Sequence, residues 1–351
     1  MFGYGLDCMR GNGSGALPLV ACRGDKSGIQ TRYFCKNDMN VPRDEWTTLP
    51  RDWPQTQMGM TKRNETYCSE APTVAIDACR KAVKMWGGDP STITHVIAVS
   101  CTGVMAPGLE TIVMKQLGIP LTAERVGINL MGCFGAFRAI SVARAFVDQN
   151  PARHRVLAVC CELCSVHFRA EMSFETFIGN AIFADGAAAF VVEALGEGQS
   201  SAAMAVEICR SASEIIDSSD SQMTWRASDD GFVFKLSQDI PASLQSAAPR
   251  FVQRLVDGDA TASDVDYAIH PGGRKIIEDL EVALSLPSNG PRTSCSWSIL
   301  RDYGNMSSAT FLFVLEHKLK HRDETPLCSS YVVGMGFGPG LALEGVLLKV
   351  R

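Results

Sequence analysis

The sequence has no long hydrophobic run and no excess of basic residues. None of its apolar stretches approaches the roughly 18 residues that mark a membrane-spanning helix, and its first residues lack the basic-then-apolar order of a signal peptide. Its 33 Lys and Arg residues are outnumbered by 38 Asp and Glu residues and are dispersed along the chain. This distribution argues against a nucleic-acid partner. We therefore expect a cytoplasmic protein with no membrane span.

The chain contains 13 cysteines, but it lacks the two closely spaced cysteine pairs of a zinc site. An odd number of cysteines, scattered through apolar stretches, is typical of free thiols in a reducing compartment. Cys161 and Cys164 have the spacing of a redox motif, but they follow an apolar strand expected at Val156–Cys160 instead of preceding a helix. Because no second pair with zinc-like spacing accompanies them, we expect no metal site.

The overall composition is that of a globular protein with a large core, since 46% of the 351 residues are hydrophobic and 20% are charged. Helical and strand patterns alternate along the chain, which predicts a layered α/β architecture. The residues before about Val20 are rich in glycine and lack a clear period, so a loop is expected there. Expected elements include a helix at Thr73–Trp86 and strands at His95–Ser100, Asp266–His270 and Leu341–Val350, and residues Ala184–Glu193 are expected to form a turn that leads into a strand of small residues.

The second half of the chain weakly repeats the first. Each half has a glycine-led pair at the start of a buried apolar helix, Gly132-Cys133 in one and Gly304-Asn305 in the other. We predict a divergent or disordered start over residues 1–21, an N-terminal half over residues 22–200 and a C-terminal half over residues 201–351. Pseudo-symmetry between the halves would bring Cys133 and Asn305 together near the centre.

Cys133 is the strongest single candidate for a reactive residue. It follows a short buried strand and a glycine turn, and it precedes an apolar helix. Unpaired N–H groups and the positive end of the helix dipole favour a thiolate at such a position. The glycines Gly132 and Gly135 would let a substrate approach the sulfur closely. The alternative is that Cys133 is a small core residue, as free cysteines commonly are.

Two further residues have chemistry that complements a thiolate. His270 stands directly after an expected strand, in a turn fixed by proline and glycine, and Asn305 opens the second apolar helix. A thiolate attacks acyl carbonyls, while an imidazole and a carboxamide can donate hydrogen bonds to the oxyanion that develops. Taken alone, His270 could be a core histidine and Asn305 a helix N-cap. Their joint placement favours a catalytic group of three residues.

Four motifs together resemble the signatures of type III polyketide synthases, the chalcone synthase superfamily. The resemblance covers roughly residues 22–351, and it is closer to microbial members than to the chalcone-forming plant enzymes. The motifs are Met131-Gly132-Cys133-Phe134-Gly135-Ala136, Ile269-His270-Pro271-Gly272-Gly273, Tyr303-Gly304-Asn305-Met306-Ser307-Ser308 and Gly336-Phe337-Gly338-Pro339-Gly340.

The resemblance implies a homodimer of thiolase-like subunits, each an αβαβα five-layer sandwich of two pseudo-symmetric halves. Cys133 would take an acyl starter from acyl-CoA, while His270 and Asn305 would bind malonyl-CoA and assist its decarboxylation. Repeated condensation and cyclisation would then give a pyrone, a resorcinol or a related phenolic, with no cofactor beyond the CoA substrates. Two alternatives stay open, namely a single condensation like that of a ketoacyl synthase III and an inactive paralogue that binds acyl-CoA.

The resemblance also implies a substrate cavity and a gate. Three positions that carry threonine in chalcone synthases fall on Cys101, Cys164 and His167, and His167 could be protonated or act as a base. A small glycine of the chalcone enzymes falls at Trp225, which would narrow the cavity. The implied gate between the CoA tunnel and the cavity is formed by Phe183 and Phe234. The other implied cavity residues are Ser307, Gly338 and Pro339.

Contacts with CoA and with a second subunit are implied less directly. The basic cluster that binds CoA in the family is matched in part by Arg23 and Lys26, and the CoA entrance would be lined by Gly272, Gly273 and Lys275. The family methionine that reaches into the partner subunit aligns with Ala106, next to Met105. Residues before Val20 do not resemble the first strand of the family, and without that strand one sheet would keep an open edge.

Overall fold

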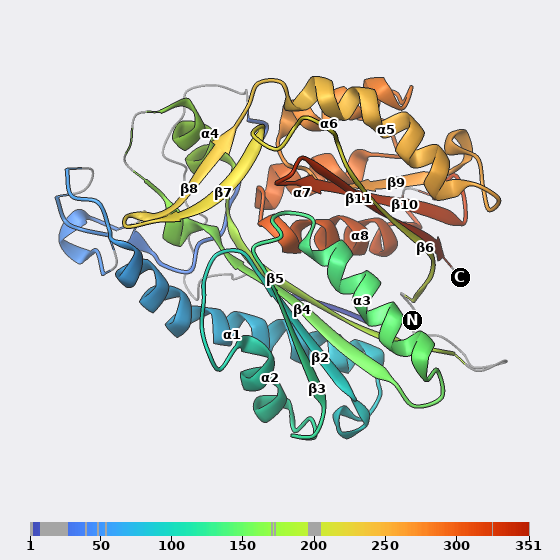
Figure 1. Cartoon of the computed structure of the whole chain (residues 1–351), viewed down its shortest axis with the longest axis horizontal. Helices are drawn as coiled ribbons and strands as arrows, with labels where there is room; N and C mark the ends of the chain where they lie inside the picture. The colour runs from blue at the N-terminus through green and yellow to red at the C-terminus, as the bar shows by residue number, and fades with distance from the viewer. Residues whose placement is uncertain are drawn as a thin grey trace.

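Two β-sheets and three layers of helices make up the protein (Figure 1). The structure is a computed structural model that describes residues 3–7, 27–38, 41–47, 49–52, 55–169, 171, 173–195, 205–324 and 326–350. Arg23 and Lys26, the residues expected to bind CoA phosphates, lie outside the described residues. Among the described residues, no helix combines the length and the apolar character needed to cross a bilayer.

The first sheet lies in the N-terminal half and has the strand order β1-β5-β4-β2-β3. Strand β2 pairs in parallel with β3 and β4, whereas β5 pairs antiparallel with β4 and β1. Strands β4 and β5 are buried on both faces, as their continuous runs of small and branched apolar residues predict. The strands are β1 (Gly3–Asp7), β2 (His95–Ser100), β3 (Glu124–Asn129), β4 (Arg155–Leu163) and β5 (Asp185–Glu193).

The second sheet lies in the C-terminal half and has the order β6-β11-β10-β9, and a separate ribbon of two strands, β7 and β8, stands beside it. Strand β9 runs parallel to β10, and the other neighbours pair antiparallel. The strands are β6 (Val206–Ile215), β7 (Met223–Ser228), β8 (Gly231–Leu236), β9 (Asp266–Ile269), β10 (Tyr331–Gly338) and β11 (Ala342–Val350).

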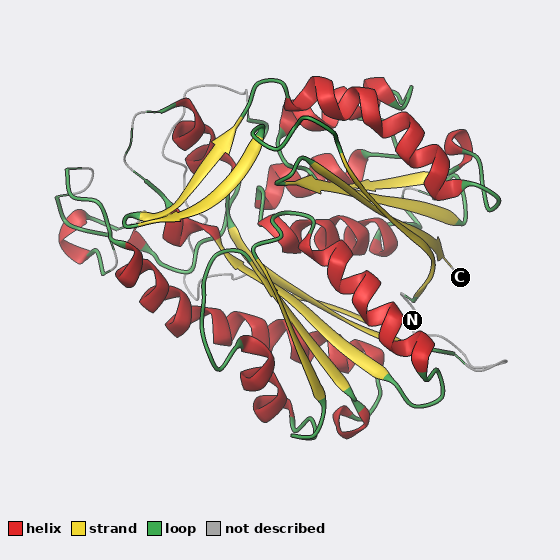
Figure 2. Cartoon of the chain, in the orientation of Figure 1, coloured by secondary structure: helices red, strands yellow, loops and turns green. Residues whose placement is uncertain are grey.

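Helices cover both faces of each sheet (Figure 2). The helices are α1 (Met60–Trp86), α2 (Leu109–Leu117), α3 (Gly135–Gln149), α4 (Phe174–Ile182), α5 (Ile240–Val256), α6 (Arg274–Ala283), α7 (Ser294–Tyr303) and α8 (Thr310–Lys320). Short 3₁₀ turns lie at η2 (Arg43–Glu45), η3 (Pro90–Thr92), η4 (Cys164–His167), η5 (Ala262–Asp264) and η6 (Ser307–Ala309).

Three hydrophobic clusters hold these layers together. One packs α1 and α2 on the outer face of the first sheet, and another packs α5 and α6 on the outer face of the second sheet. The third joins α3 and α8 between the inner faces of the two sheets. Alternate residues of β4, such as Ala158 and Val159, contribute to the inner and the outer cluster. The result is the expected αβαβα sandwich of five layers.

The long helix α1 differs from the expected helix at Thr73–Trp86. It begins at Met60, thirteen residues earlier, and it contains Pro72 within its length. A proline inside a helix removes one hydrogen bond and normally favours an end at that point. Here Tyr67 and Ala71, before the proline, and Val74, after it, are all buried against the first sheet. Burial of this continuous apolar face outweighs the local cost of Pro72.

The start of the chain also differs from expectation at Gly3–Asp7. These residues, expected in a loop, form β1, which pairs antiparallel with β5 in a register from Gly3 opposite Val191 to Asp7 opposite Ala187. An edge strand presents unpaired backbone N–H and C=O groups, and these can pair with an extended segment whatever its side-chain pattern. The open edge anticipated from the sequence is therefore covered by β1.

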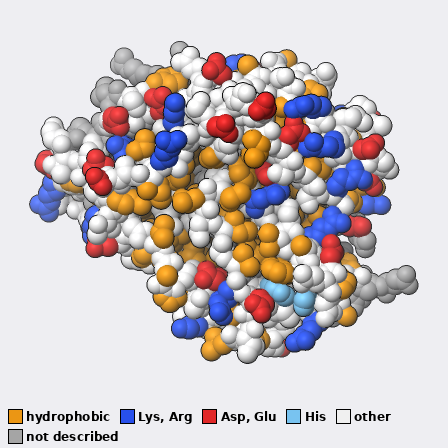
Figure 3. All heavy atoms as spheres, in the orientation of Figure 1, with side chains coloured by type: hydrophobic (Ala, Val, Ile, Leu, Met, Phe, Trp, Pro, Cys, Tyr) orange, Lys and Arg blue, Asp and Glu red, His pale blue; other side chains and the backbone are white. Residues whose placement is uncertain are grey.

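Charges of both signs are interspersed over the face of the molecule seen in Figure 3. Hydrophobic side chains gather across the middle of this face, and Lys, Arg, Asp and Glu side chains surround them. The face shows no large field of one sign, in agreement with the dispersed charges of the sequence.

Candidate active site

Cys133 lies in the turn between β3 and α3, one residue before the N-cap Phe134. The turn is tight, since Leu130 and Gly132 both have positive φ values, of 58° and 81°. Glycine is required at position 132, because a Cβ atom there would lie 2.4 Å from Cδ of Pro339. The turn therefore holds the Cys133 backbone against the Gly336–Gly340 segment of the C-terminal half.

Asn305 lies in the corresponding turn of the C-terminal half, between α7 and α8. Gly304 has a positive φ of 72°, and the Asn305 Oδ1 atom accepts a 2.8 Å hydrogen bond from the Ser307 N–H. The Nδ2 group donates a long hydrogen bond of 3.3 Å to the Gly272 carbonyl. The side chains of Asn305 and Ser307 also reach the Cys133 thiol. Pseudo-symmetry thus brings the two helix starts together, as the repeated pattern predicts.

His270 follows β9 and is fully buried. Its carbonyl accepts a 3.0 Å hydrogen bond from Gly272 N–H, and the Gly272 carbonyl accepts the bond from Asn305, so the Asn305 side chain is bonded to the turn that follows His270. The imidazole packs edge-on against Phe337, with ring centroids 5.5 Å apart. Neither ring nitrogen has a hydrogen-bond partner among the described residues. An unpaired buried imidazole is costly in a finished fold and is typical of a group that awaits a ligand.

The protonation states of this group differ from those expected from the helix dipole. Desolvation raises the pKa of the Cys133 thiol to about 11, although hydrogen bonds from the side chains of Ser307 and Asn305 act in the opposite direction. Burial likewise lowers the pKa of His270 to about 3. The free protein near neutral pH therefore holds a neutral thiol and a neutral imidazole, because low polarity outweighs the dipole at this depth.

Cys133 opens onto a small cavity between the two halves. The volume of this cavity is about 40 Å³. Its lining is almost entirely apolar or sulfur-bearing, so the thiol faces surroundings of low polarity. The lining residues are Cys101, Thr102, Gly132, Cys133, Cys164, Phe183, Met223, Trp225, Phe234, Ser307 and Pro339.

The two phenylalanines expected to form a gate face each other across this cavity. The rings of Phe183 and Phe234 form an edge-to-face pair with centroids 5.4 Å apart, and Trp225 lies 6.0 Å from Phe234. Phe183 follows α4 and Phe234 belongs to β8, so elements from both halves supply the pair. Gly338 does not line the cavity; a Cβ at that position would lie 2.7 Å from the Phe134 ring, so it permits close packing of the turn behind Cys133.

Cys101 and Trp225 form one connected wall of the cavity. The Gly132 N–H donates a 2.9 Å hydrogen bond to the Cys101 sulfur, and the Trp225 Nε1–H donates a 2.8 Å bond to the Cys101 carbonyl. Burial raises the pKa of the Cys101 and Cys164 thiols well above the ordinary value, so both are neutral. Neither competes with Cys133 through a readily formed thiolate.

His167 lies one layer behind this wall and is not among the described residues that line the cavity. Its Nε2–H donates to the Thr102 carbonyl at 2.7 Å, and its Nδ1 accepts from the Phe232 N–H at 3.4 Å. Burial lowers the pKa of His167 to about 4. The expected charged or basic His167 is therefore replaced by a neutral imidazole with both nitrogens engaged.

Glu162 is a site residue that the sequence reasoning passed over. It is fully buried at the end of β4, where its carboxylate accepts hydrogen bonds from the Cys101 N–H, the Thr102 hydroxyl and the Ser308 hydroxyl. Because Cys101 belongs to the N-terminal half and Ser308 to the C-terminal half, Glu162 links the two halves beside the cavity residues Cys101 and Ser307. Its signal in the sequence was a single acidic residue within a continuous apolar strand.

The remaining predicted residues lie at the periphery. Lys275 is exposed on α6 and forms an ion pair with Asp279, while Gly273 is the N-cap of that helix. Met105 packs against the cluster of α1 and α2, and Ala106 is exposed. No group of three or more His, Cys, Asp or Glu side chains within the described ranges is arranged to hold a metal ion.

Comparison with known proteins places this geometry in one family. Residues 22–195 match the family "Chalcone and stilbene synthases, N-terminal domain", and residues 207–351 match the corresponding C-terminal domain. Alpha-pyrone synthesis polyketide synthase-like Pks18 of Mycobacterium tuberculosis is 30% identical over 327 residues, which is 93% of this chain and 80% of that protein. Probable polyketide synthase 1 of Dictyostelium discoideum is 32% identical over 297 residues, and the match spans 83% of this chain and 9% of that protein.

Solved structures give the same result. The C-terminal type III polyketide synthase domain of Steely1 from Dictyostelium superposes with a TM-score of 0.81 at 30% identity, covering 92% of this chain and 87% of that one. PKS-I from the brown alga Ectocarpus siliculosus superposes with a TM-score of 0.84 at 28% identity, covering 93% and 87%. This chain therefore belongs to the chalcone and stilbene synthase family: by sequence and thiolase-like fold it is a type III polyketide synthase, an acyltransferase of the class that uses malonyl-CoA.

Proposed function

We propose that Cys133 is the acyl-carrying nucleophile and that His270 and Asn305 activate malonyl-CoA beside it. The observation that carries this proposal is the group around the thiol: the side chains of Asn305 and Ser307 hydrogen-bond the Cys133 sulfur, Asn305 also donates to the Gly272 carbonyl in the turn after His270, and the fully buried His270 imidazole has no hydrogen-bond partner among the described residues. An ordinary packing role for His270 would leave two buried nitrogens unsatisfied at a cost.

In the loading step, the Cys133 sulfur attacks the carbonyl of an acyl-CoA thioester. Neutral His270 can take the thiol proton as the sulfur–carbon bond forms, and it returns that proton to the departing CoA sulfur. The starter is then held as a thioester beside the apolar cavity. Burial lowers the pKa of His270 to about 3, so the imidazole is neutral at neutral pH and has a nitrogen open to a proton, but in the free protein it is a weak base.

In the extension step, malonyl-CoA loses CO₂ and its remaining two carbons become an enolate. An N–H of His270 and the Asn305 amide donate hydrogen bonds to the enolate oxygen, which replaces a strong base or a metal ion. The enolate carbon attacks the Cys133 thioester, a carbon–carbon bond forms, and the bond to the sulfur breaks. The lengthened chain is now on CoA and returns to Cys133 for the next extension. No cofactor beyond the CoA thioesters takes part in this scheme.

The expected product is a pyrone, a resorcinol or a related phenolic formed by cyclisation in the same cavity. Support comes from the narrow, apolar lining beside Trp225 and from the name of the mycobacterial relative, which refers to α-pyrone synthesis. Incubation with labelled malonyl-CoA and starters from acetyl-CoA to long-chain acyl-CoA, followed by mass spectrometry, tests this proposal. CO₂ release with products of two or more extensions supports it, a single β-ketoacyl product would indicate one condensation, and no turnover would indicate an inactive paralogue.

The raised pKa of Cys133 leads to a prediction about pH. Because desolvation favours the neutral thiol, the thiolate fraction is small at pH 7 and grows as the pH rises toward about 11. We expect the rate of Cys133 alkylation by iodoacetamide, followed by peptide mass spectrometry, to keep rising through pH 9. Subtracting the alkylation rate of the Cys133→Ser protein removes the contribution of the other cysteines. A rate that reaches its plateau below pH 7 would instead show a thiolate paired with charged His270.

We further propose that the protein is a homodimer. Large apolar side chains are exposed on two segments that lead to or from cavity residues, namely Val104 at 57% after Cys101, and Phe174 at 54% and Phe177 at 57% on α4 before Phe183. Exposed large apolar side chains that form a contiguous patch mark protein interfaces. Met105 and Ala106 follow Val104 directly, so the same surface would bring them to the partner. Light scattering at micromolar concentration should give twice the chain mass, and a Phe177→Glu protein should give the mass of one chain.

A further inference from the structure

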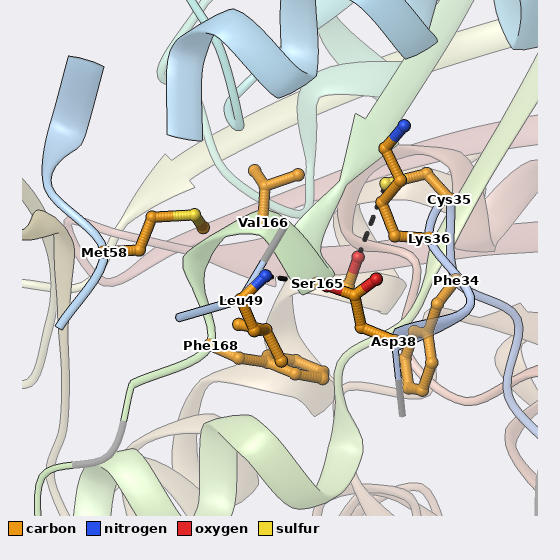
Figure 4. Close-up of a pocket in the computed structure, with 9 residues that line it drawn as sticks. All are labelled: Phe34, Cys35, Lys36, Asp38, Leu49, Met58, Ser165, Val166 and Phe168. Atoms are coloured by element: carbon orange, nitrogen blue, oxygen red, sulfur yellow. Dashed lines mark hydrogen bonds between the residues drawn. The ribbon is translucent and has the colours of Figure 1, made fainter. Parts of the chain in front are cut away.

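Arg63 on α1 is a buried arginine that binds backbone carbonyls instead of an acid. Its side chain is fully buried, and it forms no ion pair among the described residues. The Nε–H donates to the Met58 carbonyl at 2.7 Å, while Nη1 donates to the carbonyls of Val166 and Phe168. Burying a charged group is costly, so such a site implies that the geometry it imposes matters to the protein. Figure 4 shows its three acceptor residues around one small pocket of about 30 Å³.

Two of the carbonyls that Arg63 binds, those of Val166 and Phe168, belong to the residues directly before and after His167. The 3₁₀ turn η4 (Cys164–His167) carries Cys164 toward the cavity and His167 behind it. Arg63 therefore fixes the backbone of this turn from the side away from the cavity. His167 can donate to Thr102 and accept from Phe232 at the same time only as the neutral tautomer with hydrogen on Nε2. The orientation of the η4 turn therefore decides whether His167 forms both of these hydrogen bonds.

Arg63 also contacts the tip of the β7–β8 ribbon. Gly231, the first residue of β8, has a φ of 106°, and a Cβ there would lie 2.6 Å from the Arg63 Cδ and 2.7 Å from its Nε. Just beside it, Met60 N–H donates a 2.7 Å hydrogen bond to the Asp229 carbonyl. The ribbon tip is thus seated on the first turn of α1, directly over the guanidinium group.

The part of the ribbon that faces the cavity depends on this contact between the ribbon tip and α1. The Trp225 ring stacks on Phe232 at 5.2 Å and meets His167 edge-on at 5.7 Å, and its Nε1–H is bonded to the Cys101 carbonyl. Trp225 and Cys101 both line the cavity that holds the Cys133 thiol. A single buried side chain therefore contacts two segments, far apart in sequence, that contribute Cys164 and Trp225 to the cavity beside Cys133.

We propose that Arg63 is a positioning residue for product formation, because it holds the η4 turn and the β7–β8 ribbon in the one arrangement that seats Trp225 against Cys101. This proposal rests on the proposed function, in which the polyketide folds against that wall. Arg63 touches neither the thiol nor a substrate. Its loss should alter how the extended chain is folded and released, while the loading of Cys133, which depends on Asn305, Ser307 and His270, should be largely kept.

The test compares the purified full-length protein with its Arg63→Lys variant. Lysine keeps the charge but cannot span three carbonyls with a planar fork. We expect starter loading on Cys133, measured by intact-protein mass spectrometry, to stay near the wild-type level. We expect the ratio of short lactones to the main cyclised product to shift about threefold to tenfold, the effect of losing one or two hydrogen bonds. Leu255→Ala, a buried core change in α5, serves as the control for general destabilisation.

A second measurement does not depend on turnover. The contribution of Trp225 to fluorescence is isolated by subtracting the spectrum of the Trp225→Phe protein. Arg63→Lys should make this tryptophan more accessible to acrylamide quenching, and Leu255→Ala should not. If Arg63→Lys does not fold, Gly231→Ala disturbs the same contact from the ribbon side. It should shift the product ratio and the quenching in the same direction as Arg63→Lys.

The outcomes separate this inference from the proposed function. An unchanged product ratio with unchanged Trp225 quenching in Arg63→Lys, or an equal shift in Leu255→Ala, overturns the positioning role. If the wild-type protein makes no malonyl-derived product, the proposed function fails, and the quenching result alone then decides whether Arg63 holds the wall.

Discussion

Cys133→Ala should abolish transfer of the starter from acyl-CoA to the protein. The alanine side chain fits the space of the thiol without strain, so the fold and the cavity should be kept while the attacking sulfur is lost. Removing a covalent nucleophile lowers turnover by about 10⁴-fold or more in other acyl-transfer enzymes. The amount of acyl-protein formed from a radiolabelled starter, measured by intact-protein mass spectrometry, reports the effect directly.

The control for this experiment is Cys79→Ala, which removes a fully buried thiol of α1 far from the cavity. It should load the starter as the wild-type protein does. Peptide mapping adds a sharper criterion, because Cys101 and Cys164 line the same cavity as Cys133. An acyl group found on either of them in the Cys133→Ala protein would show that the nucleophile has been assigned to the wrong sulfur.

Lys318→Met should lower the free energy of unfolding by about 3–5 kcal/mol, the usual cost of leaving one partner of a buried ion pair alone. The Lys318 ammonium lies 3.1 Å from the Asp266 carboxylate, and the two side chains are only 3% and 2% exposed. The second carboxylate oxygen accepts hydrogen bonds from the N–H groups of Cys328 and Ser329. Asp266 begins β9, the strand that leads to His270, so this pair fixes the strand beneath the site.

Urea unfolding followed by circular dichroism measures this loss. The double variant Lys318→Met with Asp266→Asn is the matched control, because asparagine can still accept from both N–H groups and leaves no unpaired charge. It should recover much of the lost stability. If Lys318→Met stays within about 1 kcal/mol of the wild-type protein, the value of a surface pair, the buried pair contributes little to stability.

Local sequence patterns predicted much of the layered fold. Strand β2 begins and ends at the expected residues and β5 lies within the expected segment Ala184–Glu193, because their apolar runs are short, uninterrupted and bounded by polar or turn residues. The start of α1 was not predicted, because its apolar face continues through Pro72, and a local rule gives proline more weight than burial against a sheet. Strand β1 was missed for a similar reason, since its pairing partner β5 is almost two hundred residues away.

The sequence by itself indicated the family, because four short motifs resemble its signatures, and it predicted Cys133, His270 and Asn305 as candidate partners from their residue types at the starts of buried helices and after a strand. The tertiary structure decided how those residues are protonated. It also placed His167 behind the wall instead of in it, and it brought Arg63 under both the η4 turn and the ribbon. These features depend on desolvation and on contacts between distant segments, and neither quantity exists until the chain has folded.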